Sequence, residues 1–390
     1  MKHCFVYEYY HPHLGGGESL LKQLAEGLVE RGHQCTVVTA RLAETPAREL
    51  INGVEVRRVR VPRRGDRYWF TLMGLPAVLA AAGGADIIHA PTYNGAIAAW
   101  TAARMLRKPV VLHPFEVLGR LWLKLGIRPV PAAGFMAFER LVLSLPFDAY
   151  GCISRHTMRS LAAAAPAAGK AFLAYPGIDY SLFDPGAQDG RKEIRRQLGI
   201  DGDTFLCMYS GRPGFIKGLE FLVDAIPEIR QKVPTARFLL LLANQPETKY
   251  REALAALARF REDEVIVRPP VSRAELPLYF QASDCVIVPS LNEGFGFTCV
   301  EACTMGRPVV ATRAGSLPEV ISGRYVLVEP GSAAAIATGV ERVHRGDCQV
   351  SGIKRFEWQD AIDRHIQACE DLLASPGCAQ RSQGRPYDFK

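Results

Sequence analysis

Short apolar runs alternate with helical segments along this chain, and the alternating series occurs twice. The runs are rich in β-branched and aromatic residues, as expected for strands buried on both faces of a sheet. The predicted strands are residues 3–9, 34–39, 54–61, 86–90 and 109–112 in the first series, and 204–210, 237–242, 265–268, 285–288 and 308–312 in the second. Helical segments such as 19–31 and 218–232 separate them. This order predicts two α/β units, each with a parallel sheet covered by helices.

The length of the chain agrees with two domains. It has 390 residues, and domains usually hold roughly 100–200. Pro176 and Gly177 interrupt the pattern between the two series. We therefore predict a first domain over residues 1–178 and a second over residues 179–355. A helix is expected over residues 356–375, followed by a flexible tail over residues 376–390 that is rich in Pro, Gly, Gln and Arg.

Positive charge gathers in the first half. The net charge is +7. Residues 1–180 hold 21 Lys and Arg against 13 Asp and Glu (21 − 13 = +8), and residues 181–390 hold 26 against 27 (26 − 27 = −1). The densest run consists of Arg57, Arg58, Arg60, Arg63, Arg64 and Arg67. Such a patch attracts phosphates, anionic lipid or nucleic acid, and a solvated loop after a strand is the plain alternative. Because no nucleic-acid-binding motif accompanies it, we predict no nucleic-acid partner.

The cysteines and the apolar segments indicate a cytoplasmic protein. The ten cysteines form no CxxC pair and no Cys/His cluster with zinc spacing, so we predict no metal site. Scattered thiols fit a reducing compartment. We recognise no signal peptide, because the first apolar run is broken at Glu8. Residues 68–85 carry no charge, yet Gly74 and Pro76 interrupt them, and we expect a helix and loop packed on the core.

Residues 289–302 carry the most informative pattern, because they follow a predicted strand and open a helix. Gly294 and Gly296 leave room for a ligand to approach the backbone. The start of the helix offers unpaired N–H groups and the positive end of the helix dipole, which favour a phosphate. Glu301 inside the helix can accept hydrogen bonds from the vicinal hydroxyls of a ribose, and Glu293 can reach the hydroxyls of a sugar.

Two other interpretations of these glutamates stay open. They could be a glycosidase pair, whose carboxyl groups lie about 5–5.5 Å or 6.5–9.5 Å apart. Eight residues of helix would span roughly 12 Å, a separation that fits two residues binding opposite ends of one ligand better than a glycosidase pair. Part of the interval is loop, so this distance does not exclude the glycosidase pair. Alternatively, Glu293 is an ordinary loop acid and Glu301 a surface helix acid.

Two more loops have the composition of an anion site. Arg212 and Lys217 flank a Gly- and Pro-containing loop at the end of the first strand of the second unit, and two cations there suit a diphosphate. Gly16 and Gly17 follow the first strand of the chain, although the spacing is not that of a dinucleotide-binding GxGxxG. His113 ends a predicted strand, where a histidine is more often structural than catalytic.

Together, these motifs resemble those of retaining GT-B glycosyltransferases, closest to glycosyltransferase family 4 (group 1). Residues 293–301, with Gly-Phe-Gly inside, resemble the E-x7-E motif of that family. Residues 210–218 resemble its Gly-Arg…Lys-Gly diphosphate site. Residues 177–183, 306–311 and 315–319 resemble further donor-domain segments, and the likeness extends to about residue 375. Residues 175–177 (Tyr-Pro-Gly) depart from the pattern, since the family usually has Asn before the Gly.

The resemblance implies the GT-B architecture, with two Rossmann-like domains facing each other across a deep cleft. The first domain would bind the acceptor and the second the nucleotide-sugar donor, and the helix 356–375 would cross back to the first domain. The implied catalytic residues are His113, Glu293, Arg212 and Lys217. The implied donor-binding residues are Gly16, Gly17, Arg212, Lys217, Glu293, Gly294, Phe295, Gly296, Phe297 and Glu301.

The implied reaction is retaining transfer of a hexosyl unit from a UDP- or GDP-sugar to a hydroxyl of a sugar, a lipid-linked or a small-molecule acceptor. No cofactor or metal is expected. The alternatives are a nucleotide-sugar-binding protein of the same fold without transfer activity, and an epimerase or phosphorylase. Residues 118–146 mix apolar and basic side chains, and they suggest either an ordinary helix on the sheet or peripheral contact with an anionic membrane at its inner face.

Overall fold

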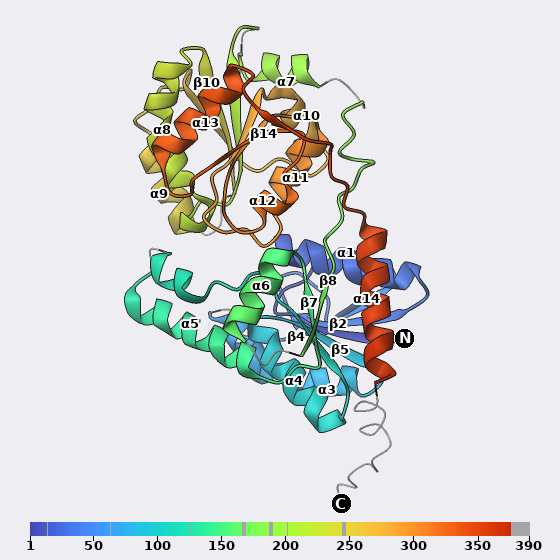
Figure 1. Ribbon diagram of the computed structural model, residues 1–390. Coiled ribbons are helices and arrows are strands. Elements are labelled where there is room, and N and C mark those ends of the chain that lie inside the picture. Colours follow the sequence, from blue (N-terminus) through green and yellow to red (C-terminus); the bar gives the residue numbers. More distant parts are fainter. Residues whose placement is uncertain are drawn as a thin grey trace, which may run out of the picture. The chain divides into compact units, whose positions relative to one another are not determined.

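The computed structural model describes residues 1–13, 15–62, 64–125, 127–165, 169–186, 190–200, 202–243 and 247–375. The tail predicted over residues 376–390 lies outside this range. The chain forms two compact units (Figure 1). The first consists of Met1–Leu123, Arg128–Gly177 and the chain from Glu357 onward, and the second consists of Lys124–Ile127 and Ile178–Phe356.

The first unit contains an eight-stranded sheet in the order β3-β4-β2-β1-β5-β6-β7-β8. Its strands are β1 (Lys2–Val6), β2 (Gln34–Ala40), β3 (Arg48–Ile51), β4 (Val54–Val59), β5 (Ile87–Pro91), β6 (Val110–His113), β7 (Ala149–Cys152) and β8 (Lys170–Leu173). All neighbours pair in parallel except β3 and β4, which form an antiparallel hairpin. The parallel α/β prediction is confirmed, and β3, β7 and β8 are additions to the predicted strands.

Helices cover both faces of this sheet, because its strands are apolar on both sides. The helices are α1 (Gly16–Glu30), α2 (Asp66–Met73), α3 (Leu75–Ala82), α4 (Asn94–Leu106), α5 (Pro129–Ser144), α6 (Arg155–Ala164) and α14 (Trp358–Leu373), with a 3-10 turn η1 (Gly119–Lys124). In β1, Cys4 and Val6 pack in the core formed with α2, α3 and α4. Phe5 packs on the opposite face with α1 and α14, which lie side by side (Figure 1).

The uncharged stretch at residues 68–85 folds as two short helices, α2 and α3, separated by Gly74. A Cβ atom at Gly74 would lie 2.6 Å from the carbonyl oxygen of Phe70, so the sequence needs glycine at this bend. Among the described residues, no helix carries an apolar run of the length a bilayer requires.

The second unit contains a seven-stranded sheet in the order β11-β10-β9-β12-β13-β14-β15. Its strands are β9 (Phe205–Gly211), β10 (Ala236–Leu242), β11 (Val265–Arg268), β12 (Cys285–Val288), β13 (Val309–Thr312), β14 (Arg324–Val328) and β15 (Gln349–Val350). Only β15 is antiparallel to its neighbour among these strands. The five strands predicted for this half all occur, and β14 and β15 are additional.

The helices of the second unit lie between successive strands, as the alternation predicts, except α7, which precedes the first strand. They are α7 (Arg191–Gln197), α8 (Leu219–Lys232), α9 (Glu247–Leu257), α10 (Leu276–Ala282), α11 (Phe297–Thr304), α12 (Leu317–Val320) and α13 (Ala333–His344), with a 3-10 turn η2 (Phe215–Lys217). Apolar side chains of α8 and α13 pack with alternate residues of β9, β10 and β12 in one buried core. Burying each large apolar side chain contributes about 1.5–3 kcal/mol to the free energy of folding. This core therefore holds in place the edge of the sheet that carries the predicted site.

Candidate functional site

The predicted donor residues of the second unit, which are all of them except Gly16 and Gly17, gather at the carboxyl edge of the second sheet, where the strand order reverses. Strand β9 is the first of its unit, and it has β10 on one side and β12 on the other. The loop after β9 leads to α8 and the loop after β12 leads to α11. Since β9 and β12 are neighbours, their following loops leave the sheet side by side. Ligands of open α/β sheets bind at such a reversal point.

Close backbone contacts join the two loops. The amide of Leu291 donates a 2.7 Å hydrogen bond to the carbonyl oxygen of Ile216. Gly218 has a φ of +68°, and a Cβ atom there would lie 1.9 Å from the carbonyl oxygen of Pro289. Only glycine allows both this conformation and this approach. The Lys-Gly pair that the sequence singled out therefore positions the lysine directly against the other loop.

Glu293 and Lys217 form one charged pair. Lys217 Nζ donates to Glu293 Oε1 at 2.7 Å, and Ser290 Oγ donates to the same oxygen at 2.9 Å. The amide and the hydroxyl of Ser316 donate to the carbonyl oxygen of Glu293 at 3.0 and 3.1 Å. Lys217 and Ser290 thus hold the carboxylate of Glu293, and Ser316 holds its backbone. Sequence reasoning had placed Glu293 and Lys217 at different parts of a donor.

The glycines and phenylalanines of the motif shape the start of α11. Gly296 precedes the helix with a φ of +89°, and its missing Cβ leaves space beside Leu317. Phe295 is buried and packs edge-on against Phe297 and Phe356, with ring centroids 5.0 and 5.2 Å apart. These rings hold the turn in one conformation, so the first N–H groups of α11 stay at the carboxyl edge of the sheet.

Glu301 is a buried acid with an incomplete set of partners. It is 2% exposed and pairs with Arg273, whose Nη2 lies 2.9 Å from Oε1. That contact lacks hydrogen-bond geometry, and among the described residues Oε1 has no hydrogen-bond donor. Burial raises the pKa of Glu301, and the nearby Arg273 opposes this rise. A buried carboxylate oxygen without a donor is costly, and a hydroxyl-bearing ligand would satisfy it.

Arg212 has an anchored backbone and an exposed side chain. Its carbonyl oxygen accepts a 3.1 Å hydrogen bond from the hydroxyl of Tyr209, whose pKa is raised by burial. The guanidinium is at the surface of the unit, where it can meet an anion without first breaking a buried contact.

In the first unit, Gly16 and Gly17 are the first residues of α1, which begins three residues earlier than the predicted helix over residues 19–31. A Cβ atom at Gly17 would lie 3.0 Å from the ring of Phe115, whereas one at Gly16 would meet nothing within 4 Å. Gly17 is therefore required for packing, and Gly16 is the more open of the two positions.

His113 ends β6, as predicted, and its ring is 2% exposed. Its Nε2 lies 3.0 Å from Nδ1 of His89, and the ring stacks on His365 with centroids 5.4 Å apart. A Cβ atom at Gly151 would lie 2.8 Å from Nδ1 of His113, so glycine provides the space for the imidazole. Burial lowers the pKa of His113 far below its usual value. The catalytic role implied by the resemblance stays a prediction.

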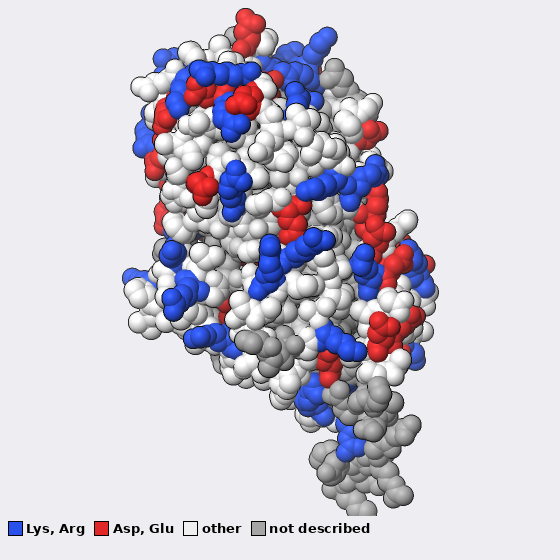
Figure 2. All heavy atoms as spheres, viewed as in Figure 1, with Lys and Arg blue, Asp and Glu red and all other residues white. Residues whose placement is uncertain are grey.

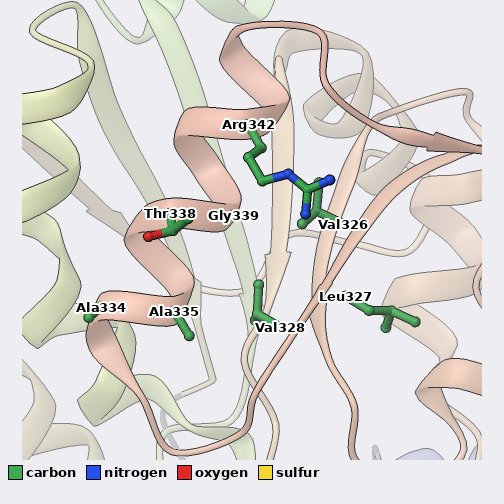
Figure 3. Close-up of a pocket in the computed structure, with 8 residues that line it drawn as sticks. All are labelled: Val326, Leu327, Val328, Ala334, Ala335, Thr338, Gly339 and Arg342. Carbon is green, nitrogen blue, oxygen red and sulfur yellow. The ribbon is translucent and has the colours of Figure 1, made fainter.

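Elsewhere in the second unit, a cavity of about 350 Å³ lies between α13 and β14 (Figure 3). Thr338 and Arg342 are its polar lining residues, and the remaining lining is mainly aliphatic. None of the predicted donor residues lines it, so it adds nothing to the site at the end of β9 and β12.

Figure 2 shows that the drawn face carries basic and acidic side chains interspersed, without a continuous field of one sign. Within the basic run of the first unit, Arg58 is buried and forms an ion pair with Glu49, and Arg57 pairs with Glu55. Arg63 and the side chain of Arg67 lie outside the described residues. These two pairings are internal contacts of the β3–β4 hairpin region, so the run is in part structural.

Sequence reasoning missed the residues that support the acids, namely Ser290, Ser316 and Arg273. Ser290 stands three residues before Glu293, and a local side-chain hydrogen bond could have been anticipated from that spacing. Ser316 and Arg273 come from distant loops, and nothing in the local pattern marks them.

Comparisons with known proteins agree with this arrangement. Residues 190–351 match the family described as glycosyl transferases group 1, and residues 15–177 match a glycosyl transferase 4-like domain. The D-inositol 3-phosphate glycosyltransferase of Pseudarthrobacter chlorophenolicus is 30% identical over 90% of this chain and 92% of its own length. The enzyme of the same name from Thermobifida fusca is 28% identical over 92% of this chain and 89% of its own length.

Solved structures resemble the chain in fold. Sucrose-phosphate synthase from Thermosynechococcus elongatus matches with a TM-score of 0.74 and 21% identity, covering 98% of this chain and 97% of that one. HepE of Anabaena, solved in complex with UDP-glucose, matches with a TM-score of 0.72 and 20% identity, covering 95% of this chain and 100% of that one.

Proposed function

Because this chain belongs to the group 1 glycosyltransferases and has the GT-B fold, we propose that it transfers a hexosyl unit from a UDP- or GDP-sugar to a hydroxyl acceptor, with retention of anomeric configuration. The observation that carries the proposal is the buried carboxylate of Glu301, whose Oε1 contacts Arg273 Nη2 at 2.9 Å and has no other donor within the described residues. The two hydroxyls of a donor ribose would supply the missing hydrogen bonds.

The proposed chemistry is electrostatic. The bond between the anomeric carbon and the diphosphate oxygen breaks, and a bond from that carbon to the acceptor oxygen forms. The diphosphate gains negative charge as it leaves, and the proton of the acceptor hydroxyl passes to the departing diphosphate oxygen or to solvent. Arg212 and Lys217 would stabilise the leaving charge, together with the first N–H groups of α11.

Glu293 has two roles in this proposal. Its Oε1 orients the Lys217 ammonium at 2.7 Å, and its carboxylate would accept hydrogen bonds from the hydroxyls of the transferred sugar. Since Ser290 and Ser316 fix the residue, little reorganisation is needed when the donor binds. The roles of Gly16, Gly17 and His113 rest on the resemblance, and no cofactor enters the proposed reaction.

The donor class is tested by thermal stabilisation. UDP-, GDP- and ADP-sugars are added separately to the purified protein, and the melting temperature is measured. A ligand that binds only the folded state raises stability by about 2.7 kcal/mol at a concentration 100 times its Kd. We expect one nucleotide class to raise the melting temperature, and the Glu301→Gln variant to lose most of that shift. If no nucleotide sugar shifts the transition, the proposed function is wrong.

Stereochemistry and activity need a separate assay. Proton NMR of the first product formed from an α-linked donor should show an α-linked glycoside, and a β-linked product would refute retention. Nucleotide release without any acceptor product, across a panel of acceptors, would instead favour the binding-protein or epimerase alternatives.

We propose that the acceptor is anionic and belongs to the phosphorylated polyols, because the named relatives are D-inositol 3-phosphate glycosyltransferases. The excess of eight positive charges over residues 1–180 agrees with an anionic acceptor. Turnover with inositol phosphate, compared with unphosphorylated inositol, tests this. Equal rates with both acceptors would remove the requirement for a phosphate.

A peripheral membrane contact is a second proposal for the first unit. Helix α2 leaves Tyr68, Trp69, Leu72 and Met73 exposed on its surface, and such side chains favour the lipid interface. The protein should sediment with phosphatidylglycerol vesicles, and the double change Trp69→Ser and Leu72→Ser should abolish this. Vesicles that leave the wild-type protein in the supernatant would exclude the contact.

A further inference from the structure

Five of the nine histidines of the chain gather on one face of the first sheet. They are His3, His33, His89, His113 and His365. Their positions follow from the strand alternation: His3 and Phe5 point to the same side of β1, and β5 and β6 place His89 and His113 beside them. The mechanism proposed above involves only one of the five.

Four of these rings form a continuous series of nitrogen contacts. Nδ1 of His33 lies 3.0 Å from Nε2 of His3, and Nδ1 of His3 lies 3.0 Å from Nε2 of His89. Nδ1 of His89 then lies 3.0 Å from Nε2 of His113. The series crosses the sheet from the partly exposed His33 to the buried His113.

A thiol on the helix above completes a cluster in the middle of this series. Cys369 lies on α14 and packs against Ile87 and Val111 of the sheet. One ligand atom each of His3, His89 and Cys369 lie within 4.8 Å of one another, and all three residues are buried. The cluster is thus built from β1, β5 and α14, three elements held together by the core of the unit.

We propose that His3, His89 and Cys369 bind one divalent metal ion of the zinc class inside the first unit, at a site separate from the donor site. Zinc takes four tetrahedral ligands, preferably imidazole nitrogen and cysteine sulfur. With zinc–nitrogen bonds of about 2.0–2.1 Å, two imidazole ligands in a tetrahedron stand about 3.3 Å apart. The 3.0 Å between Nδ1 of His3 and Nε2 of His89 must open by about 0.3 Å, and both rings must turn so that these two nitrogens face the ion. Water can fill the fourth position.

The outer contacts fit the same assignment. Imidazoles that bind metal ions usually donate a hydrogen bond from their other nitrogen, which fixes the ring. Here Nε2 of His3 faces His33, and Nδ1 of His89 faces His113. Both ligand rings therefore already have an imidazole partner on the side away from the ion.

The proton balance of binding is simple. In the metal-free series, one proton lies between His3 and His89, since a hydrogen bond needs one donor. On binding, the ring that carries this proton moves it to its other nitrogen and donates it to its outer neighbour, which is His33 for His3 and His113 for His89. That neighbour accepts the hydrogen bond after moving its own proton to its other nitrogen. All rings stay neutral, and the Cys369 thiol releases one proton to solvent as the thiolate binds the ion.

The experiment uses protein purified without a polyhistidine tag. The protein is treated with a chelator, incubated with Zn²⁺ or Co²⁺, and freed of unbound metal by gel filtration before elemental analysis. We expect about one ion per chain, a thiolate-to-cobalt charge-transfer absorption for the Co²⁺ form, and a higher melting temperature that a chelator reverses.

The Cys369→Ser and His89→Gln variants should lose the bound metal and the melting shift. Cys152→Ser is the matched control, because Cys152 is another buried thiol that packs in the core on the opposite face of the same sheet, and this variant should bind as the wild type does. Circular dichroism checks that each variant is folded.

Two results would overturn the proposal. Wild-type protein without metal after this treatment would show that the cluster is a plain hydrogen-bonded series of histidines. Equal metal content in Cys369→Ser and in the wild type, with no cobalt–thiolate absorption, would place the bound metal elsewhere. Both results leave the glycosyltransferase proposal untouched, since neither uses turnover.

Discussion

The two parallel sheets of this molecule carry opposite kinds of polar chemistry. At the carboxyl edge of the second sheet, the polar groups are ionic: Glu293 with Lys217, and Glu301 with Arg273. On the α14 face of the first sheet, they are neutral imidazoles, because burial lowers the pKa of His3 to about 3 and of His365 to about 4. Buried charges cost far more than buried neutral groups unless they are paired.

This difference separates an edge that can bind a charged donor from a face whose imidazoles contact one another. The ionic edge keeps groups that a charged ligand can use, such as the exposed Arg212 and the incompletely satisfied Glu301. The imidazole face satisfies its nitrogens internally and fills its space closely around Gly151. Changes at the ionic edge should therefore alter activity more than stability, and changes on the imidazole face should do the reverse.

The largest expected effect is on turnover. Lys217→Ala removes the cation that we propose for the leaving diphosphate, and loss of one such group typically lowers kcat about 10²–10³-fold. The melting temperature should change little. Lys249→Ala is the control, because Lys249 is a surface lysine of α9 paired with Glu252. Equal turnover in the two variants would contradict the assignment of Lys217.

Glu301→Gln should weaken the binding of the nucleotide sugar while it makes the folded protein more stable. Losing a charged hydrogen-bond acceptor costs about 1.5–3 kcal/mol of binding, so the Kd for the nucleotide sugar should rise roughly 10- to 100-fold, as measured by calorimetry. At pH 7 the variant should nevertheless melt at a higher temperature than the wild type, since burial disfavours the ionised acid.

The pH dependence of that stability difference has a definite sign. The folded pKa of Glu301 lies above its unfolded value of 4.5, so the folded state holds the proton more tightly. The stability contributed by the wild-type acid is present below pH 4.5 and is lost as the pH rises through the folded pKa. The advantage of Glu301→Gln should thus disappear near pH 4, and a constant difference in melting temperature from pH 4 to 7 would refute the shift.

The close packing of the imidazole face can be tested by adding a carbon atom at Gly151. In Gly151→Ala, the added carbon would lie 2.8 Å from Nδ1 of His113 and 3.0 Å from the ring of Phe172. Overpacking of this kind costs about 1–3 kcal/mol, measured by urea denaturation. Gly134→Ala is the matched change in the exposed helix α5, where nothing lies within 4 Å, and it should stabilise by about 0.5–1 kcal/mol. A stable Gly151→Ala variant would show that the face is loosely packed.

The smallest expected effect concerns Ser290, which donates to Glu293 Oε1 at 2.9 Å. Ser290→Ala removes one neutral donor to the carboxylate, worth about 0.5–1.5 kcal/mol, so kcat should fall roughly 2- to 10-fold. The exposed Ser351 provides the control substitution. If Ser290→Ala were as slow as Lys217→Ala, the serine and not the lysine would be the main support of Glu293.

Much of the fold could be predicted from the sequence, because parallel strands are apolar on both faces and form recognisable runs. Strands β9 to β13 were found at nearly their observed bounds, since each contains a run of apolar residues. Strands β7 and β8 were missed. Strand β7 contains Gly151, which interrupts the apolar signal, and β8 begins with Lys170 and is only partly buried.

The sequence allowed us to predict which residues belong to the candidate site, but not which of them contact each other. The loops at residues 212–218 and 289–296 were both identified, yet the direct pairing of Lys217 with Glu293 depends on β9 and β12 being neighbours. The histidine cluster escaped notice because its members are far apart in sequence. Their only signal is that His3, His89 and His113 belong to β1, β5 and β6, which are adjacent only once the strand order is known.

The division of the chain at Gly177 and at Glu357 has a consequence for recombination. The second unit is almost continuous from Ile178 to Phe356, whereas the first needs α14 from beyond it to complete its core with Ile362 and Cys369. In genetic terms the second unit is an insertion into the first. A chimera that exchanges donor modules must therefore splice at both junctions, and it must keep Gly177, where a side chain would collide with the backbone of Trp358.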